Sequence, residues 1–233
     1  PERFGKGPWK FLHRYADAHK ETIAKHTTVW VTDGSSHEDE LAFRLPWVMQ
    51  RRTKAEVMTE LPARTRQTIS IKVPERAIVP IWKEGWGKTR RDTLKRALSL
   101  SGTGKIKEAV ELVTSRVDEG HSVVVFSHLR ETAAKIAKSL KVGAVFLATG
   151  EVNAKERTKL IADARKVAAK KPVVIVATID AVGVGVDLSF ADVAVFVDLD
   201  WVPSKLLQAE GRIHRHGQKN PVIIYYLVGI GTA

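Results

Sequence analysis

Hydrophobic residues gather into five short runs in the second half of the chain, separated by longer segments of helical periodicity. The runs are apolar throughout and lack the alternation of a strand with one face in water. They lie at residues 123–126, 145–148, 173–177, 193–197 and 222–227, and helices are predicted over 129–141, 153–169 and 203–215. Strands apolar on both faces that alternate with helices predict a parallel α/β sheet flanked by helices.

The beginning of the chain has a different pattern. Residues 1–60 are predicted to be mostly helical and irregular, with an apolar run broken at Pro46. Alternation of polar and apolar residues over 68–73 predicts a strand that begins the next domain. We therefore expect a mostly helical appendage over residues 1–63 and an α/β domain over residues 64–233.

The totals fit a folded protein with a sizeable core. The chain has 233 residues, of which 44% are hydrophobic. No apolar run approaches the roughly 20 residues of a membrane span, and the N-terminus has no secretory hydrophobic region. A cytoplasmic or nuclear location is expected. The absence of cysteine excludes disulfides, thiolate catalysis and zinc-ribbon sites in this sequence.

The positive charge is concentrated in one stretch. The formal net charge is +12, and residues 62–107 hold twelve Lys or Arg against three acids, a net of +9. Much of this stretch is predicted to be helical, and Trp82 and Trp86 lie within it. Cations interleaved with aromatic residues suit a nucleic-acid backbone. A basic, solubilising surface whose tryptophans pack inward is the open alternative.

Polar and glycine residues follow the predicted strands where each one ends. Ser127 and His128 follow the first run, Thr149 and Gly150 the second, and Thr178 the third. In parallel sheets these loops share one edge, where ligands bind. Hydroxyls and backbone amides at such turns are common phosphate ligands, so we predict contacts to a nucleic-acid backbone. Ordinary helix capping is the alternative for each hydroxyl.

The segment QAEGRIHRHGQ, residues 208–218, carries the strongest chemistry. On an ideal helix Gln208, Arg212 and Arg215 share one face. Guanidinium groups match phosphate oxygens, so this face would suit a polyphosphate or a transferring phosphoryl group. A solvated face is the alternative that these residues alone leave open.

Three tempting motifs fail on their spacing. GTGK at residues 102–105 lacks the earlier glycine of a phosphate loop, and Ile106 stands where Ser or Thr would hold magnesium. The glycine-rich run near residue 185 has Leu188 where the dinucleotide fingerprint needs its third glycine. His214 and His216 have no further ligands at metal-site spacing, so no metal site is assigned.

Taken in order, these stretches resemble the second RecA-like lobe of SWI/SNF-type DNA translocases of helicase superfamily two. Within that family the sequence is most similar to the annealing-helicase (HARP-like) branch, which rewinds DNA. The segments that carry the family resemblance are MQRRTKAEV with ELPARTRQ, VVVFSHLRETAAKIAKSL, ATGEVNAKER, ATIDAVGVGVDLSFADVAVFVDLDWVP, and QAEGRIHRHGQ followed by YYLVGIGTA. The similarity to the annealing-helicase branch rests on FLHRYADAH, DELAFRLPWVMQRRTK and QAEGRIHRHGQ.

The resemblance implies a role for each matching residue. Arg212 and Arg215 would be arginine fingers for ATP, and Gln208 opens the same motif. Gly183, Gly185 and Asp187 would belong to the motif that couples nucleotide to DNA. Ser127, His128, Thr149, Gly150 and Thr178 would lie along the DNA strand, and Arg51 and Arg52 would brace the two lobes.

Three positions depart from the family pattern. Val182 replaces a residue that is usually small, Val202 stands where the family has asparagine, and Gly211 replaces an acid that often precedes the first finger. Glycine inside a helix costs about 1 kcal/mol relative to alanine. These departures concern fine geometry, because both arginines remain.

The resemblance also implies what the chain lacks. The phosphate loop, the magnesium-binding acid and the water-positioning group would lie in a missing first lobe that holds ATP with Mg²⁺. The expected intact protein is a DNA-dependent ATPase acting on duplex or branched DNA, and this chain alone is expected to be inactive. Two alternatives are a non-catalytic nucleic-acid-binding module and a nucleotide enzyme of Rossmann type.

Overall fold

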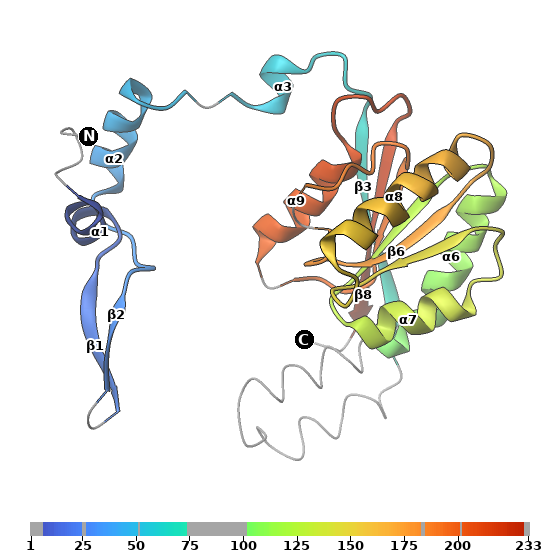
Figure 1. The fold of residues 1–233 in the computed structure, drawn as a ribbon, viewed down its shortest axis with the longest axis horizontal. Coiled ribbons are helices and arrows are strands. Elements are labelled where there is room, and N and C mark those ends of the chain that lie inside the picture. The colour runs from blue at the N-terminus through green and yellow to red at the C-terminus, as the bar shows by residue number, and fades with distance from the viewer. Residues whose placement is uncertain are drawn as a thin grey trace. The chain divides into compact units, whose positions relative to one another are not determined.

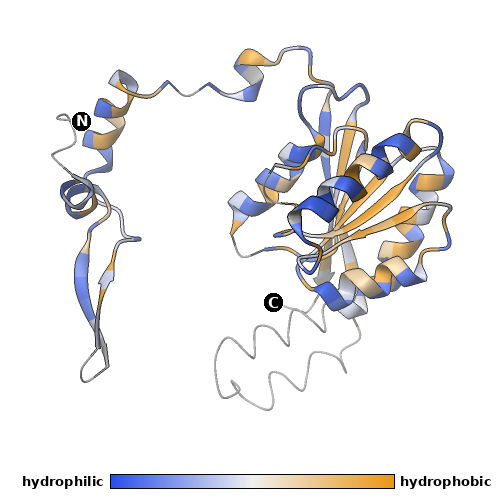
Figure 2. Cartoon of the chain, viewed as in Figure 1, coloured by the Kyte–Doolittle hydropathy of each residue, from blue (hydrophilic) through white to orange (hydrophobic). Residues whose placement is uncertain are grey.

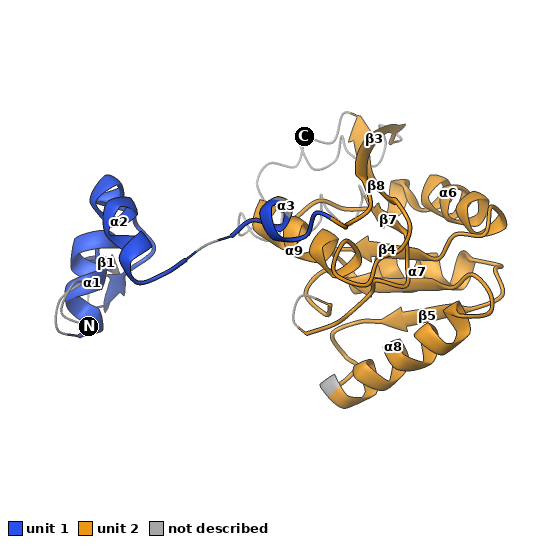
Figure 3. Ribbon diagram, turned by 90° about the horizontal axis from the view of Figure 1, so that it is seen from above, with its two compact units in different colours: residues 1–59 blue, residues 60–233 orange. Residues whose placement is uncertain are grey.

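The computed structural model describes residues 7–24, 27–50, 52–73, 102–182, 185–200 and 202–230. The chain divides into two compact units, Pro1–Thr59 and Glu60–Ala233 (Figure 3). The predicted basic helical stretch over residues 76–99, with Trp82 and Trp86, lies outside the described residues. Among the residues that are described, no helix is long and apolar enough to cross a membrane.

A six-stranded, wholly parallel sheet forms the centre of the second unit (Figure 1). Its strand order is β3-β8-β7-β4-β6-β5. This confirms the predicted parallel α/β sheet, including the strand predicted over residues 68–73. The strands are β3 Arg64–Lys72, β4 Val123–Ser127, β5 Val145–Ala148, β6 Val174–Thr178, β7 Val193–Phe196 and β8 Val222–Ile230.

Helices cover both faces of this sheet because its strands are apolar on both sides. Along β4, Val124 and Phe126 point to the face covered by α8 (Ala154–Ala168) and α9 (Pro203–Ile213). Val123 and Val125 point to the other face, covered by α6 (Ile106–Asp118) and α7 (Arg130–Ser139). Figure 2 shows the apolar strands between helices with polar outer faces.

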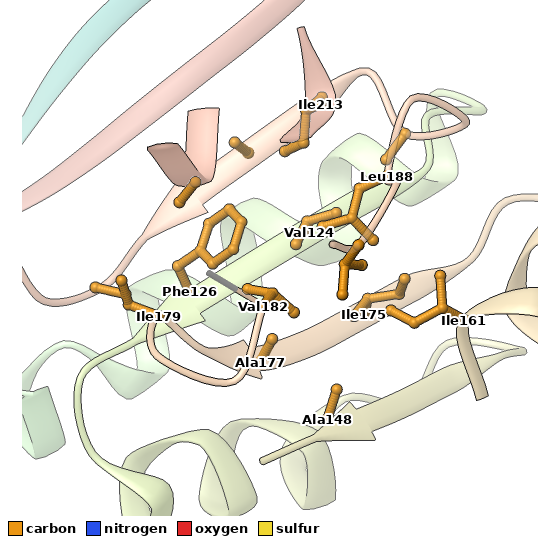
Figure 4. Close-up of a cluster of buried hydrophobic side chains, with 14 of the residues drawn as sticks. Val124, Phe126, Ala148, Ile161, Ile175, Ala177, Ile179, Val182, Leu188 and Ile213 are labelled. Carbon is orange, nitrogen blue, oxygen red and sulfur yellow. The ribbon is translucent and has the colours of Figure 1, made fainter. Parts of the chain in front are cut away.

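The core on the α8 and α9 face reaches into the loop after β6. Val182, Leu188 and Ile213 are all fully buried in it, as Figure 4 shows. The larger side chain that distinguishes Val182 from the family pattern therefore fills core volume. Phe126, Phe196 and Tyr226 stack across β4, β7 and β8, with successive ring centroids 4.7 and 5.1 Å apart.

The first unit contains helices α1 (Pro8–Tyr15), α2 (Glu38–Arg44), η2 (Leu45–Trp47) and α3 (Lys54–Val57). It also contains an antiparallel hairpin of β1 (His19–Ala24) and β2 (Thr27–Val31), which the sequence interpretation did not predict. β-Branched residues in β2 favour this strand. Glu40 accepts hydrogen bonds from Arg14 and Tyr15 and joins α2 to α1.

Candidate functional site

Three of the predicted backbone contacts lie in one row at the carboxyl ends of neighbouring strands. Ser127 pairs with Thr178 in the β4–β6 register, and Thr149 directly follows Ala148, the last residue of β5. All three residues are buried, with exposed fractions of 0%, 6% and 6%. His128 is partly exposed and Gly150 is exposed. The row therefore presents mainly backbone and the short segments that follow it.

The Ser127 hydroxyl belongs to a buried polar cluster. It donates a hydrogen bond of 2.7 Å to Asp198, whose side chain is 1% exposed. Lys105 Nζ lies 3.6 Å from Asp198 and donates to the Leu227 carbonyl at 3.2 Å. Burial lowers the pKa of Lys105, although the charge of Asp198 opposes this.

This cluster explains the GTGK sequence without a phosphate. A Cβ on Gly102 would lie 2.8 Å from Asp198 Oδ1, and one on Gly104 would lie 2.7 Å from Val73. Both glycines therefore allow the chain before α6 to pack closely on its neighbours. Lys105 is 4% exposed and engaged with Asp198, an arrangement that differs from a lysine directed at bound nucleotide.

The turn from β7 into α9 is held by Asp200. Its carboxylate accepts from the Val202 amide at 2.9 Å and lies 3.5 Å from His128 Nδ1 and 3.4 Å from Lys205 Nζ. Val202 occupies the N-cap without a side-chain hydrogen bond. Asp200 therefore orders this turn. At the N-cap, where Val202 stands, the asparagine of the family pattern could itself cap the helix.

Helix α9 carries Arg212 but ends before Arg215. His214 leaves the helical backbone at φ −85° and ψ 82°. The Gln218 side chain donates to the carbonyls of Ile213 and Ala191 and so supplies a partner at the helix end. The predicted helix to residue 215, with Gln208, Arg212 and Arg215 on one face, is therefore wrong for Arg215, which lies in the following turn.

A buried carboxylate anchors the last turn of α9 to the sheet. Glu210 is 0% exposed and accepts two hydrogen bonds from Arg66, at 2.8 and 2.7 Å, and one from Arg64 at 3.0 Å. The Tyr226 hydroxyl also donates to it. Burial raises the pKa of Glu210, but the hydrogen bonds and charges of these partners outweigh it and lower the pKa overall.

A second carboxylate, that of Asp187 in the loop after β6, lies beside Arg165 and Arg215. Asp187 accepts from Arg165 at 2.7 Å and lies 3.9 Å from Arg215 Nε. Burial raises the pKa of Asp187, but hydrogen bonds from Arg165 and Ser189 lower it overall. The Leu188 amide donates to the Arg212 carbonyl at 3.0 Å. The loop is thus joined to both arginine-bearing positions.

Gly185, in the same loop, has a φ of +74°, which favours glycine. Gly183 lies outside the described residues, as does Arg51. Arg52 is exposed beside α3, whose N-terminus carries a capping box between Thr53 and Glu56. Within the described part of the chain, no group of His, Cys, Asp and Glu has metal-site geometry.

The hydroxyl row and the arginine end of α9 form two regions at opposite ends of the strands. The hydroxyl row lies at the carboxyl ends, whereas the arginine end of α9 lies at the amino ends. Glu210 meets Arg64, the first residue of β3, and His214 Nε2 donates to the Pro62 carbonyl at 2.8 Å. The 11-residue helix α9 spans about 16 Å and leads from the turn after β7 to the arginine end.

Sequence reasoning missed the charged residues that hold these regions in place. Glu210 and Asp198 lie within the segments that resemble the family, but nothing in their spacing pairs them with Arg66 and Lys105, which lie 144 and 93 positions earlier. A charged residue within an otherwise apolar strand or helix face is the one signal that pointed to them, because such groups are rarely buried unpaired.

The amino-acid sequence of the chain is similar to those of known helicases. The model of the helicase conserved C-terminal domain matches residues 104–217. The "DNA annealing helicase and endonuclease ZRANB3" of Bos taurus is 28% identical over 252 residues, which cover 100% of this chain and 23% of that protein.

A second relative is the "SWI/SNF-related matrix-associated actin-dependent regulator of chromatin subfamily A-like protein 1" of Xenopus tropicalis. It is 33% identical over 220 residues, covering 88% of this chain and 23% of that protein. The chain thus spans about a quarter of the length of these two relatives. The Sulfolobus solfataricus SWI2/SNF2 ATPase core in complex with dsDNA shares the fold, with a TM-score of 0.55 and 22% identity over 96% of this chain and 51% of that one.

Proposed function

We propose that the chain, whose residues 104–217 match the model of the helicase conserved C-terminal domain, is the second RecA-like lobe of an ATP-dependent DNA translocase of the SWI/SNF type. In this proposal Arg212 and Arg215 act on ATP that a first lobe of the same polypeptide holds with Mg²⁺. The predicted cytoplasmic or nuclear location goes with this proposal.

The observation that carries the proposal is the frame around the two arginines. Glu210 fixes the turn of α9 that holds Arg212, and the Leu188 amide bonds the Arg212 carbonyl. Asp187, from the loop after β6, lies beside Arg215 in the turn that follows the helix. Arg215 remains 39% exposed. Positively charged groups on a fixed frame are suited to stabilising charge that develops on a transferring phosphoryl group.

Asp187 gives Arg215 a partner that phosphate oxygens can replace. In the proposed mechanism the exposed Arg215 exchanges this carboxylate for the polyphosphate when the lobes close. Arg165 then remains as the partner of Asp187, at 2.7 Å. The proton positions of the arginines do not change in this step, because a guanidinium stays charged throughout.

DNA would be bound at the other end of the strands. Gly150, the partly exposed His128 and the backbone beside Thr149 and Thr178 offer small polar groups to phosphates. The loop after β6 follows Thr178 and reaches Asp187 and Leu188, so it connects the proposed DNA and ATP regions. Its place between them supports the coupling role that the predicted motif gives to Gly183, Gly185 and Asp187.

The names of the relatives support a finer proposal. One is called a DNA annealing helicase, which fits the resemblance to the annealing-helicase branch and the predicted action on duplex or branched DNA. The alternative is a nucleic-acid-binding module without ATPase activity. It shares the DNA-binding end of the strands but gives no role to the frame around Arg212, so the two functions separate at the arginines.

The test changes each arginine in the intact protein and measures DNA-stimulated ATP hydrolysis. Arg212→Ala and Arg215→Ala should each lower kcat by about 10³-fold or more, the scale of an arginine finger. Arg157→Ala on α8 removes one guanidinium elsewhere on the same unit and should retain activity. Undiminished hydrolysis in both finger variants would contradict the proposal, and loss in the Arg157 control as well would show a nonspecific effect of charge.

A further inference from the structure

Glu210 is the most thoroughly engaged buried charge among the described residues, and the proposed chemistry does not use it directly. Its carboxylate accepts from Arg64, from both nitrogens of the Arg66 fork and from Tyr226. It lies on α9 two residues before Arg212. No solvent reaches it, since its exposed fraction is 0%.

Such a cluster needs an explanation beyond stability. Removing the Glu210 carboxylate from water is costly, and its partners Arg64 and Arg66 are 30% and 44% exposed. An ion pair with a buried member often contributes no more to stability than well-packed apolar residues of similar volume. A buried pair does, however, fix one arrangement of its elements, because a shifted helix would leave a buried charge without partners. The paired arrangement therefore selects a single position for the turn that holds Glu210.

The neighbouring residues make this turn dependent on an external anchor. Gly211 follows Glu210 inside the helix, where glycine costs about 1 kcal/mol relative to alanine. The helix ends two residues later, at Ile213. Beyond it, His214 donates to the Pro62 carbonyl, so the end of the helix is attached again to the chain that enters β3.

The partners of Glu210 belong to rigid parts of the sheet. Arg64 and Arg66 lie on β3, and Tyr226 lies on β8 at the end of the ring stack that includes Phe196 and Phe126. The ring stack fixes the plane of Tyr226 and therefore the direction of its hydroxyl. The planar fork of Arg66 adds a directional contact that a lysine could not reproduce.

We propose that Glu210 is a positioning residue: its buried carboxylate sets the last turn of α9 against β3 and β8, and so sets the direction in which Arg212 and Arg215 meet bound nucleotide. The inference rests on the proposed function. Glu210 does not touch nucleotide in this account, and its effect passes through the two arginines.

The test is Glu210→Gln in the intact protein, with kcat, KM for ATP and DNA affinity measured well below the unfolding temperature. Glutamine keeps the shape of the side chain but loses the negative charge that pairs with Arg64 and Arg66. We expect kcat to fall about tenfold or more, with KM for ATP and the Kd for DNA changed less than about threefold. Arg66→Lys should lower kcat in the same way, because it loses the fork.

A second variant separates positioning from stability. The double variant Glu210→Met/Arg66→Met replaces the main pair with apolar side chains and should regain much of the thermal stability that Glu210→Gln loses. Its kcat should stay low, because the directional contact is absent. If kcat returns with stability, or if Glu210→Gln keeps full kcat, the carboxylate has only a structural role and the inference is overturned.

Parallel variants distinguish this failure from a failure of the proposed function. The inference depends on Arg212 acting on ATP, so Arg212→Ala must first be shown to abolish hydrolysis. Loss in Arg212→Ala with full activity in Glu210→Gln would overturn the positioning role alone. Glu111→Gln on α6 is the matched control, since that carboxylate is 67% exposed and forms only a weak pair with Lys107 at 3.9 Å; it should leave kcat unchanged.

Discussion

The hydroxyl row at the carboxyl ends of β4, β5 and β6 and the arginine end of α9 differ in what they expose. Ser127, Thr149 and Thr178 are buried, and the Ser127 hydroxyl is committed to Asp198. At the arginine end the carboxylate of Glu210 is buried, whereas Arg215 is 39% exposed. In the hydroxyl row the side chains are buried and the backbone is accessible. At the arginine end the supporting carboxylate of Glu210 is buried and the guanidinium of Arg215 is partly exposed.

Hydroxyl and guanidinium groups can both bind phosphate, but in this fold they differ in how accessible they are to a ligand. Each region contains a buried carboxylate whose partners come from distant parts of the sequence. In the hydroxyl row the carboxylate of Asp198 holds the end of β4 in place, and a ligand would contact the backbone there. At the arginine end it holds a helix turn whose side chains would meet the ligand. The two regions should therefore respond differently to similar substitutions.

The largest effect on stability is expected at the row. Asp198→Ala leaves the ammonium group of Lys105 buried without its partner and should destabilise the chain by about 3–5 kcal/mol. Urea unfolding followed by circular dichroism measures this change. The double variant Lys105→Met/Asp198→Leu should recover most of the loss, and a double variant as unstable as Asp198→Ala would show that the pair is not the cause.

A smaller effect separates the buried from the exposed part of the row. Ser127→Ala removes a hydrogen bond to a charged group and should cost about 1.5–3 kcal/mol of stability, yet leave the DNA affinity of folded protein nearly unchanged. Fluorescence anisotropy with a labelled duplex measures that affinity. A large loss of affinity in Ser127→Ala would mean that this buried hydroxyl contacts DNA directly.

Gly150→Asp should show the opposite pattern. Nothing lies within 4 Å of an added Cβ at Gly150, so the fold should accept the side chain. Its carboxylate would repel phosphates and weaken DNA binding about fivefold to tenfold. Gly143→Asp, before β5, is the control for an added charge elsewhere and should retain affinity; equal losses in both variants would remove the case for a phosphate contact at this edge.

The smallest effect is expected in acid. The pKa of Glu210 is lowered from an ordinary value of 4.5, so below about pH 4.5 the unfolded chain takes up this proton before the folded one does. Stability is therefore present above that value and lost as the pH falls toward the folded pKa. Glu210→Gln should flatten this acid limb by at most about 1.4 kcal/mol per pH unit. An unchanged slope would contradict the lowered pKa.

Most of the second unit could be predicted from the sequence because apolar runs and helical periodicity are local signals. They identified the strands and helices of the sheet, and parallel topology brought Ser127 and Thr178 together. The hairpin of β1 and β2 was missed, because its residues lack a strong apolar alternation. The end of α9 was also misjudged, since it depends on contacts that Gln218 makes with Ala191 and Ile213.

The two-region arrangement itself could not be read from the sequence. The motif residues follow one another along the chain, and only the return direction of α9 carries Arg212 to the amino ends of the strands. The partners of Glu210 come from β3, more than 140 residues earlier. Long-range ion pairs of this kind have no periodicity, so they become visible only when the strands are assembled.

The most direct measurement uses the double variant Arg212→Ala/Arg215→Ala of the intact protein. DNA-stimulated ATP hydrolysis and the Kd for duplex DNA are determined on the same preparation. We predict that hydrolysis falls by about 10³-fold or more, while Kd changes less than about threefold, because the arginine end lies at the opposite end of the strands from the proposed DNA contacts. Full hydrolysis in the double variant would contradict it.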